Sequence, residues 1–303
     1  MKNILGLLLF ISQFVFAQHN VALLHVEPRL DNATSRTAEY SEIPFQMAGG
    51  MIVVQASVNG KTGNFILDTG APGIVLDAKN EAFVANCKGG SVNGALNVGQ
   101  VLVNDFQLGI IHEEKTQGNL LDVHHLELAC GMDIMGLIGY EVLKGYEVVF
   151  DFPNHKIQAF KSGTTRFSKQ KPTLALPFML CGHVPVIVGK VGGKRVFLGL
   201  DSGAGVNVLD RKFFKKIKAA NRSNIKQELL TGLENMPNQV MAADVNETRL
   251  RSTSLPSMRY VFTDLGGLRD NFGVAIDGLL GIPFFRDKVV SIDYGQKKVF
   301  IWQ

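Results

Sequence analysis

The clearest pattern along the chain is a pair of β-hairpins. Residues Met51–Val58 and Val184–Val191 are rich in apolar and β-branched side chains, which favours strands. Each run is followed by a turn signal, Gly60-Lys61 in the first case and Gly193-Lys194 in the second. Apolar return strands are then expected over 64–67 and 197–200. Helical periodicity is confined to short pieces such as 211–220, after a potential N-cap at Asp210. The pattern predicts an all-β protein.

The two hairpins belong to a longer internal repeat. Residues 43–77 align without a gap on residues 176–210, 133 positions later, and about two in five aligned positions are identical. A second matching pair follows in each half, Gly136-Leu137-Ile138-Gly139 and Gly278-Leu279-Leu280-Gly281. Chance does not give such a match without gaps, so the chain is expected to contain two copies of one unit.

The repeat sets the expected domain boundaries. The first unit is placed at 43–161 and the second at 175–303, with the polar, basic and proline-containing segment 162–174 as a linker. Between the repeated segments the halves diverge. The glycine-rich stretch 88–99 is expected to form a mobile hairpin, and 231–240 occupies the comparable place in the second half.

The first residues are typical of a targeting segment. Lys2 is followed by a short apolar run over 4–16, and small side chains precede a cleavage site after Ala17. We therefore expect residues 1–17 to be a signal peptide and 18–42 an N-terminal extension. No later segment approaches the length of a membrane span. The expected product is an exported protein, periplasmic or secreted, without a stable membrane span.

Composition narrows the function classes. The 303 residues are 46% hydrophobic and 19% charged, which is typical of a globular protein. The net charge of +4 is modest and argues against nucleic-acid binding. Three cysteines are few for an exported protein. A Cys87–Cys130 disulfide that leaves Cys181 free is one interpretation, and three buried thiols is the favoured one.

The candidate chemistry lies in two triplets that follow apolar strands. Asp68-Thr69-Gly70 and Asp201-Ser202-Gly203 occupy equivalent positions in the repeat. A single triplet of this kind indicates no more than a turn. Two copies, each followed by alanine and another apolar strand, indicate a shared site instead.

These motifs resemble the catalytic loops of retropepsin-like (clan AA) aspartic proteases in their single-chain, two-lobed form. The two Gly-flanked apolar motifs resemble the element found downstream in the same family. The resemblance implies two homologous lobes related by a pseudo-twofold axis, with Asp68 and Asp201 as the catalytic pair. It also implies that Thr69 and Ser202 hydrogen-bond across the lobe junction. Gly70 and Gly203 would let backbone N–H groups approach the carboxylates.

The implied activity is that of an aspartic endopeptidase acting on extended polypeptide. Two close carboxylates share one proton, so that one can activate water and the other can polarise the scissile carbonyl. No cofactor or metal is expected, and a monomer is sufficient for the site. Ala71 and Ala204 replace the hydroxyl residues of the pepsin-like branch, which predicts activity at mildly acidic to near-neutral pH.

Other interpretations remain open at the level of sequence. The fold could serve as a peptide- or protein-binding module with little or no hydrolysis, or as a structural β-protein. The segment His124-His125 with Glu127 and Cys130 has no defensible zinc spacing and is interpreted as a solvated loop. The basic run over 211–218 is interpreted as the solvent-exposed face of a short helix, with Phe213, Phe214 and Ile217 packed inward. Contact of this face with an anionic membrane is the weaker alternative.

Overall fold

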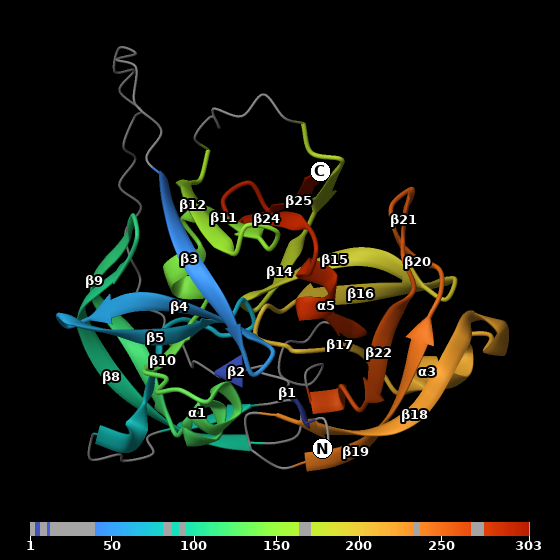
Figure 1. The fold of residues 1–303 in the computed structure, drawn as a ribbon, viewed down its shortest axis with the longest axis horizontal. Helices are drawn as coiled ribbons and strands as arrows, with labels where there is room; N and C mark the ends of the chain where they lie inside the picture. The colour runs from blue at the N-terminus through green and yellow to red at the C-terminus, as the bar shows by residue number, and fades with distance from the viewer. Residues whose placement is uncertain are drawn as a thin grey trace, which may run out of the picture.

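The chain folds into an all-β molecule with two lobes and a sheet that joins them (Figure 1). The structure is a computed structural model, and it describes residues 4–6, 11–12, 40–80, 87–90, 95–163, 171–232, 237–267 and 276–302. The expected fold class, with two homologous lobes and short helices, is confirmed.

Each half contributes its own series of strands. In the first half these are β3 (Tyr40–Ala48), β4 (Met51–Val58), β5 (Lys61–Leu67), β6 (Val75–Asp77), β7 (Cys87–Gly90), β8 (Ala95–Leu108), β9 (Ile111–Leu121), β10 (Gly136–Ile138), β11 (Tyr146–Asp151) and β12 (Lys156–Lys161). In the second half they are β13 (Leu174–Pro177), β14 (Met179–Cys181), β15 (Val184–Val191), β16 (Lys194–Leu200), β17 (Asn207–Asp210), β18 (Arg222–Thr231), β19 (Pro237–Val245), β20 (Thr248–Leu250), β21 (Thr253–Leu255), β22 (Met258–Thr263), β23 (Gly278–Leu280), β24 (Val289–Asp293) and β25 (Lys298–Trp302).

Helical structure in the described residues is short. It consists of α1 (His124–Cys130), α2 (Tyr140–Leu143), α3 (Lys212–Lys216), α5 (Ile282–Phe285) and the 3₁₀ turns η1 (Ala78–Asn80) and η2 (Ala219–Asn221).

The duplication seen in the sequence is also present in the strand pairing. In the first lobe the strands lie in the order β7-β8-β9-β6-β10-β5-β4-β3, and in the second in the order β18-β19-β22-β17-β23-β16-β15. In both lobes the strand before the Asp triplet pairs in parallel with the Gly-flanked apolar strand, β5 with β10 and β16 with β23. The repeated sequence therefore specifies a repeated topology.

A sheet built from both halves holds the lobes together. Its order is β13-β25-β24-β11-β12-β3, and β11 pairs with β24 over five residue pairs, from Glu147↔Asp293 to Asp151↔Val289. This sheet lies along the top of the molecule in Figure 1, and the C-terminus lies beside it. Three strands of the second half are followed in it by three of the first, and because the two sets are joined through the β24–β11 pair, the Asp68 and Asp201 loops are fixed relative to one another.

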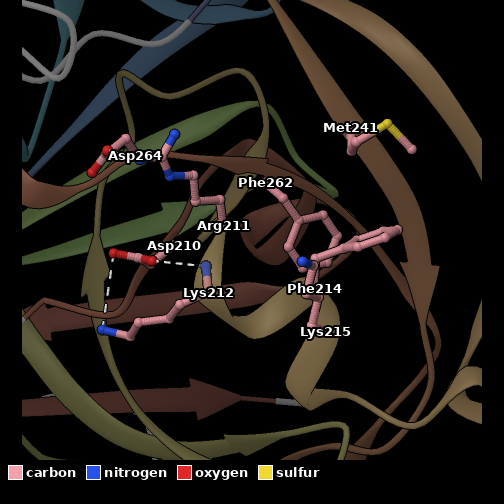
Figure 2. Close-up of a pocket in the computed structure, with 8 residues that line it drawn as sticks. All are labelled: Asp210, Arg211, Lys212, Phe214, Lys215, Met241, Phe262 and Asp264. Carbon is pink, nitrogen blue, oxygen red and sulfur yellow. Dashed lines mark hydrogen bonds and ion pairs between the residues drawn. The ribbon is translucent and has the colours of Figure 1, made fainter.

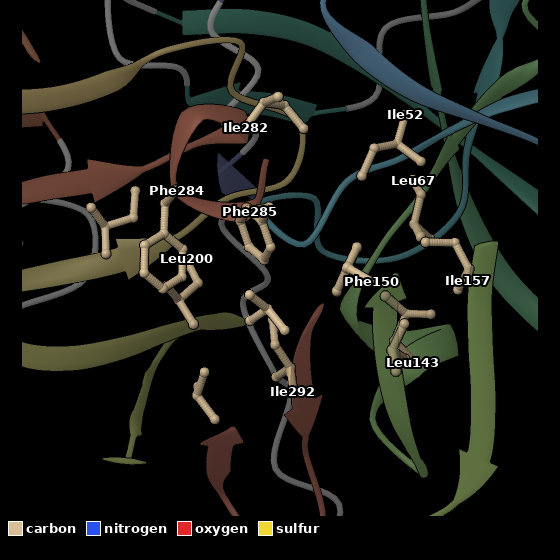
Figure 3. Packing of buried hydrophobic residues seen from close by; sticks show 14 of the residues in the cluster. Ile52, Leu67, Leu143, Phe150, Ile157, Leu200, Ile282, Phe284, Phe285 and Ile292 are labelled. Atoms are coloured by element: carbon tan, nitrogen blue, oxygen red, sulfur yellow. The ribbon is translucent and has the colours of Figure 1, made fainter. Parts of the chain in front are cut away.

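The core runs across the junction between the halves. Leu67 and Phe150 of the first half share one cluster with Leu200 and Phe285 of the second, as Figure 3 shows. The Phe150 and Phe285 rings lie 5.1 Å apart between centroids. All four side chains are fully buried, at 0% exposure. Burial of this apolar surface is the main force that keeps the lobes in contact.

The expected hairpins are confirmed, with turns displaced by one residue. The turn residues are Asn59-Gly60 and Gly192-Gly193, all with positive φ, while Lys61 and Lys194 already begin the return strands. Two consecutive positive φ angles suit the twist of a two-residue hairpin. The return strands consequently start three residues earlier than the sequence predicts.

The helix expected over 211–220 is shorter in the structure. α3 covers only Lys212–Lys216, and its first N–H is capped by Asp210, whose Oδ1 lies 2.9 Å from the amide nitrogen of Lys212. Phe213 and Ile217 are buried as predicted, and Phe214 is partly buried against the core. The chain leaves the helix at Ile217, where the backbone becomes extended.

The divergent segments form hairpins in both halves. β7 pairs with β8 from Cys87↔Val98 to Gly90↔Ala95, and β18 pairs with β19 as far as Thr231↔Pro237. Two short N-terminal strands, β1 (Ile4–Gly6) and β2 (Ile11–Ser12), pair with β18 and β7 respectively. Whether residues 1–17 are removed stays a prediction. Within the described ranges, no helix has the length and apolar character needed to cross a membrane.

Candidate active site

The two predicted aspartates lie at the ends of equivalent strands in the two lobes. Asp68 follows β5, and Asp201 follows β16. The amide of Asp68 donates to the carbonyl of Ile138 at 2.9 Å, and the amide of Asp201 donates to the carbonyl of Leu280 at 3.1 Å. The acceptors belong to the Gly-flanked apolar strands β10 and β23. As predicted, these strands brace the Asp loops from behind.

Thr69 and Ser202 connect the two loops by reciprocal hydrogen bonds. The Thr69 amide donates to Ser202 Oγ at 3.0 Å, and the Ser202 amide donates to Thr69 Oγ1 at 2.9 Å. Each hydroxyl in turn donates to a carbonyl of the opposite strand, Thr69 Oγ1 to Leu200 at 2.9 Å and Ser202 Oγ to Leu67 at 2.7 Å. The hydroxyl groups and amides of Thr69 and Ser202 are thereby satisfied, and the loops are held at a fixed distance.

Gly70 and Gly203 allow close approach of the carboxylates. The Gly70 amide donates to Asp68 Oδ1 at 2.8 Å, and the Gly203 amide donates to Asp201 Oδ1 at 2.9 Å. A Cβ on Gly70 would lie 2.8 Å from Cγ of Asp201, and one on Gly203 would lie 2.3 Å from Cγ of Asp68. Each glycine therefore packs against the carboxyl group of the other lobe, where no larger residue fits.

The environment of the carboxyl groups raises both pKa values. Burial, opposed by the N–H of Gly70, raises the pKa of Asp68 to about 7. Burial, followed by the charge of Asp68, raises the pKa of Asp201 well above its ordinary value. Both residues are 0% exposed, and Oδ2 of each has no hydrogen-bond partner among the described residues. The pair can hold a proton near neutral pH.

Two further glycines let the bracing strands reach the loops. A Cβ on Gly139 would lie 2.2 Å from the carbonyl oxygen of Ala71, and one on Gly281 would lie 2.3 Å from that of Ala204. Ala71 and Ala204 themselves are fully buried and carry no hydroxyl that could donate to the carboxylates. Because no hydroxyl at these positions stabilises the charged carboxylates, the pKa values of Asp68 and Asp201 are expected to be raised, as observed.

His183 is a site residue that the sequence does not reveal. It lies in the turn between β14 and β15, is 8% exposed, and its Nε2 lies 2.8 Å from the carbonyl oxygen of Gly70 in the other lobe. The same peptide group presents its N–H, from Ala71, to Asp68. The aligned position in the first half is Gly50, which has no side chain. Only this asymmetry within the repeat could have marked His183 in advance.

The other candidate groups do not join the site. Cys130 is free and half-buried, with Sγ donating to the Ala48 carbonyl at 3.6 Å, so the Cys87–Cys130 disulfide is wrong. Cys181 is a free, buried thiol, as favoured; the side chain of Cys87 lies outside the described residues. The interpretation of 124–130 as a solvated loop is also wrong, because it forms α1 with Leu126 buried.

The carboxylate of Glu127 connects α1 to the segments around it. Its buried carboxylate pairs with Lys79, contacts Nδ1 of His124 at 3.3 Å and accepts from the Ile134 amide at 3.1 Å. A lysine and two further donors thus complete the shell of this acid, and the pKa of Glu127 is lowered by them despite burial. No cluster suited to a metal ion occurs in the part of the chain that the structure describes.

Two lobes that each contribute an Asp-Thr/Ser-Gly loop, joined by reciprocal hydroxyl bonds, define the architecture of retropepsin- and pepsin-like aspartic proteases. Comparison with known proteins supports the similarity to aspartic proteases. Residues 187–284 match the family model described as aspartyl protease. The crystal structure of an aspartic proteinase from Irpex lacteus is similar, with a TM-score of 0.55 and 15% identity, covering 88% of this chain and 97% of that one. No curated protein sequence matches the chain. The resemblance to this family is confirmed, and at this identity the structural match establishes the fold.

Proposed function

We propose that the protein is an aspartic endopeptidase whose water is activated between Asp68 and Asp201. The observation that carries the proposal is the convergence of the two carboxyl groups, each packed on the glycine of the opposite loop. Their raised pKa values are those expected of acids that share one proton.

The mechanism follows from the half-protonated pair. The ionised carboxyl accepts a proton from water, which attacks the scissile carbonyl, and the protonated carboxyl donates a hydrogen bond to the carbonyl oxygen. The water attacks directly, so no covalent intermediate is formed. The Gly70 and Gly203 amides stabilise the ionised forms, and Thr69 and Ser202 preserve the separation that a bound water needs. The pair titrates as a unit, and neither acid is assigned a separate role.

The proposed substrate is a polypeptide in an extended conformation. The pairing of β2 with β7 and of β1 with β18 supports this, because it leaves both hairpins in contact with extended backbone. A strand added to a sheet edge is held mainly by main-chain hydrogen bonds. Such binding tolerates many side chains, which suits an endopeptidase.

Cleavage of an unfolded protein and of a peptide library across pH tests this function. The wild-type chain should hydrolyse both, whereas Asp68→Asn and Asp201→Asn should each abolish hydrolysis with folding retained, since Asn cannot deprotonate water. The rival function, a peptide-binding module on the same fold, is supported if the wild type binds the library but releases no products at any pH.

We further propose that the enzyme is exported, periplasmic or secreted. The support is the Lys2 and apolar run that precede Ala17. N-terminal sequencing of the protein from the producing cell should give Gln18, or a later residue if 18–42 is also removed. Recovery with an intact N-terminus from the cytoplasm would refute export.

A further inference from the structure

Three cations form a row across the second lobe. Lys190 on β15 lies directly opposite Arg195 on β16, and opposite Arg249 on β20 on its other side. Directly opposed residues of antiparallel strands project from the same face of a sheet. All three side chains are exposed. Adjacent strands lie about 4.8 Å apart, so the charges repel one another.

This repulsion is not compensated inside the protein. None of the three cations forms an ion pair with a described carboxylate; Arg195 lies over the Phe197 ring at 5.5 Å, which leaves its charge unpaired. Glu247 near the adjacent turn accepts from Asn221 instead. The row is therefore a fixed positive feature of the surface.

The fold itself does not require the charges. In the first lobe the equivalent row consists of Ser57, which lies opposite Thr62 on β5 and opposite Gln107 on β8. Ser57 and Thr62 align with Lys190 and Arg195 in the repeat. One lobe thus has a neutral row and the other a row of three cations on the same scaffold.

The cations border a groove with an apolar floor. The groove has a volume of about 390 Å³ and is lined by Lys190, Arg195, Arg249 and Arg251 together with Leu176, Pro177, Val188 and Gly189. Val188 is 36% exposed, and no acidic or aromatic residue lines the groove. The hairpin β20–β21 that supplies Arg249 and Arg251 stands at the upper right of Figure 1, beside β15 and β16.

The floor of this groove includes an unpaired part of a strand edge. On the side away from β16, β15 pairs with β14 through Val184–Val186 and with β20 at Lys190. Residues 187 and 188 lie between these partners and have no strand paired with them on this side within the described structure, whereas Gly189 lies against Arg249 and Leu250 of β20. Val188 is the exposed residue of this stretch, and its partner on β16, Phe197, directs its own N–H and C=O to Asp277, so the backbone groups of Val188 face the open edge and can pair with an added segment of polypeptide.

A second pocket of the same lobe contains cations that form ion pairs with nearby acidic residues. It lies beside α3, measures about 590 Å³ and contains Arg211 and Lys212 (Figure 2). There Arg211 pairs with Asp264 at 2.8 Å, and Lys212 lies 3.9 Å from Asp210. Arg211 and Lys212 are thus paired with the protein's own acids, whereas Lys215, which also lines this pocket, is paired with none of the described ones. The cations of the row in the groove have no such partner in the part of the chain that the structure describes and are available to bind a ligand.

We propose that the groove between β15 and the β20–β21 hairpin binds an acidic polypeptide segment that also carries an apolar side chain. The four cations would pair with carboxylates, the floor would take the apolar side chain, and the open edge would pair with the backbone. A single-stranded nucleic acid would be held largely by stacking on aromatic side chains, and none lines the groove. A membrane surface would require protruding apolar side chains, whereas here the apolar atoms form the floor of a recess.

The groove lies apart from the catalytic pair. Arg195 and Asp201 are separated by six residues along β16 and its end, or about 20 Å at 3.3 Å per residue. If the proposed endopeptidase function holds, the groove would hold an acidic part of a substrate at least six residues from the scissile bond.

Binding is tested without cleavage in full-length protein carrying Asp201→Asn. The probe is a labelled peptide with glutamates around one leucine, compared with its glutamine counterpart by fluorescence anisotropy. Replacing the row by its first-lobe equivalents, Lys190→Ser with Arg195→Thr and Arg249→Gln, should weaken binding of the acidic peptide by at least roughly tenfold. The matched control Lys215→Gln with Lys218→Gln removes exposed cations of the other basic surface and should change affinity by less than about twofold.

Three results would overturn the proposal. These are no preference of the wild type for the acidic peptide over the glutamine peptide, equal losses in the two variants, or stronger binding to vesicles of anionic lipid than to the peptide. Circular dichroism verifies that each variant is folded.

A cleavage assay in the active chain separates this proposal from the proposed function. The row variant should raise KM for a substrate with a distant acidic block and leave kcat unchanged, while cleavage of a neutral substrate stays as in the wild type. Absence of all cleavage with acidic-peptide binding intact would refute the peptidase but keep the groove.

Discussion

At the scale of single residues, the site depends on side chains that the repeat duplicates and on one, His183, that it does not. The aspartates and their Thr and Ser partners are visible in the sequence because the repeat duplicates them. His183 is not, because its contact with Gly70 spans 113 positions and has no counterpart in the first half. Spacing and motif can predict what a fold repeats. They cannot predict a contact that only one lobe makes.

His183 is expected to act as a positioning residue. Its Nε2 fixes the peptide between Gly70 and Ala71, whose N–H faces Asp68. His183→Ala leaves the buried Gly70 carbonyl unsatisfied and should lower kcat by roughly tenfold, with KM little changed. His183→Gln, which can place an N–H near the same carbonyl, should restore most of the rate. Equal losses in both variants would show that the imidazole serves packing alone.

At the scale of elements, the hairpins were predictable, with the turns displaced by one residue and the starts of the return strands by three, since β-branched runs and glycine turns are local signals. The shared sheet was not predictable, because the pairing of β11 with β24 joins segments more than 130 residues apart and no local pattern specifies it. The length of α3 was overestimated for a related reason. The chain after Ile217 forms η2 and then the strand β18 instead of continuing the helix. Pairing of this strand within the sheet therefore overrides the helical periodicity of the sequence.

The bracing of the Asp loops by the Gly-flanked strands predicts a specific sensitivity. Gly139→Ala would place a Cβ 2.2 Å from the Ala71 carbonyl, and should lower the free energy of unfolding by about 3 kcal/mol. Gly145→Ala is the matched control, since a Cβ there meets nothing within 4 Å, and should change stability by less than about 0.5 kcal/mol. Urea denaturation measures both. A stable Gly139→Ala protein with normal cleavage would contradict the bracing role.

At the scale of the whole molecule, folding brings two acids together in a buried position that disfavours their charge. Their pKa values are raised, so the folded state binds more protons than the unfolded state between about pH 4 and pH 7. The stability that this contributes is fully present below the unfolded pKa and is lost as the pH rises through the folded pKa.

The free energy of unfolding should therefore fall as pH rises from about 4 to 7, by up to about 1.4 kcal/mol per pH unit for each proton bound in excess. Asp201→Asn removes one titrating group, so its slope over the same window should be smaller by that amount. Denaturant titrations at several pH values provide the comparison. Parallel curves for the two proteins would mean that Asp201 does not titrate in this range.

The central claim is that Asp68 and Asp201 form one site from two lobes, and a double-mutant cycle on the cleavage rate measures this most directly. Groups that act as a unit are strongly non-additive. Asp68→Asn and Asp201→Asn should each reduce the rate to background near neutral pH, and the double variant should be no slower than either. Substantial cleavage by one single variant, or losses that multiply in the double variant, would show that the two acids work separately and would contradict the account.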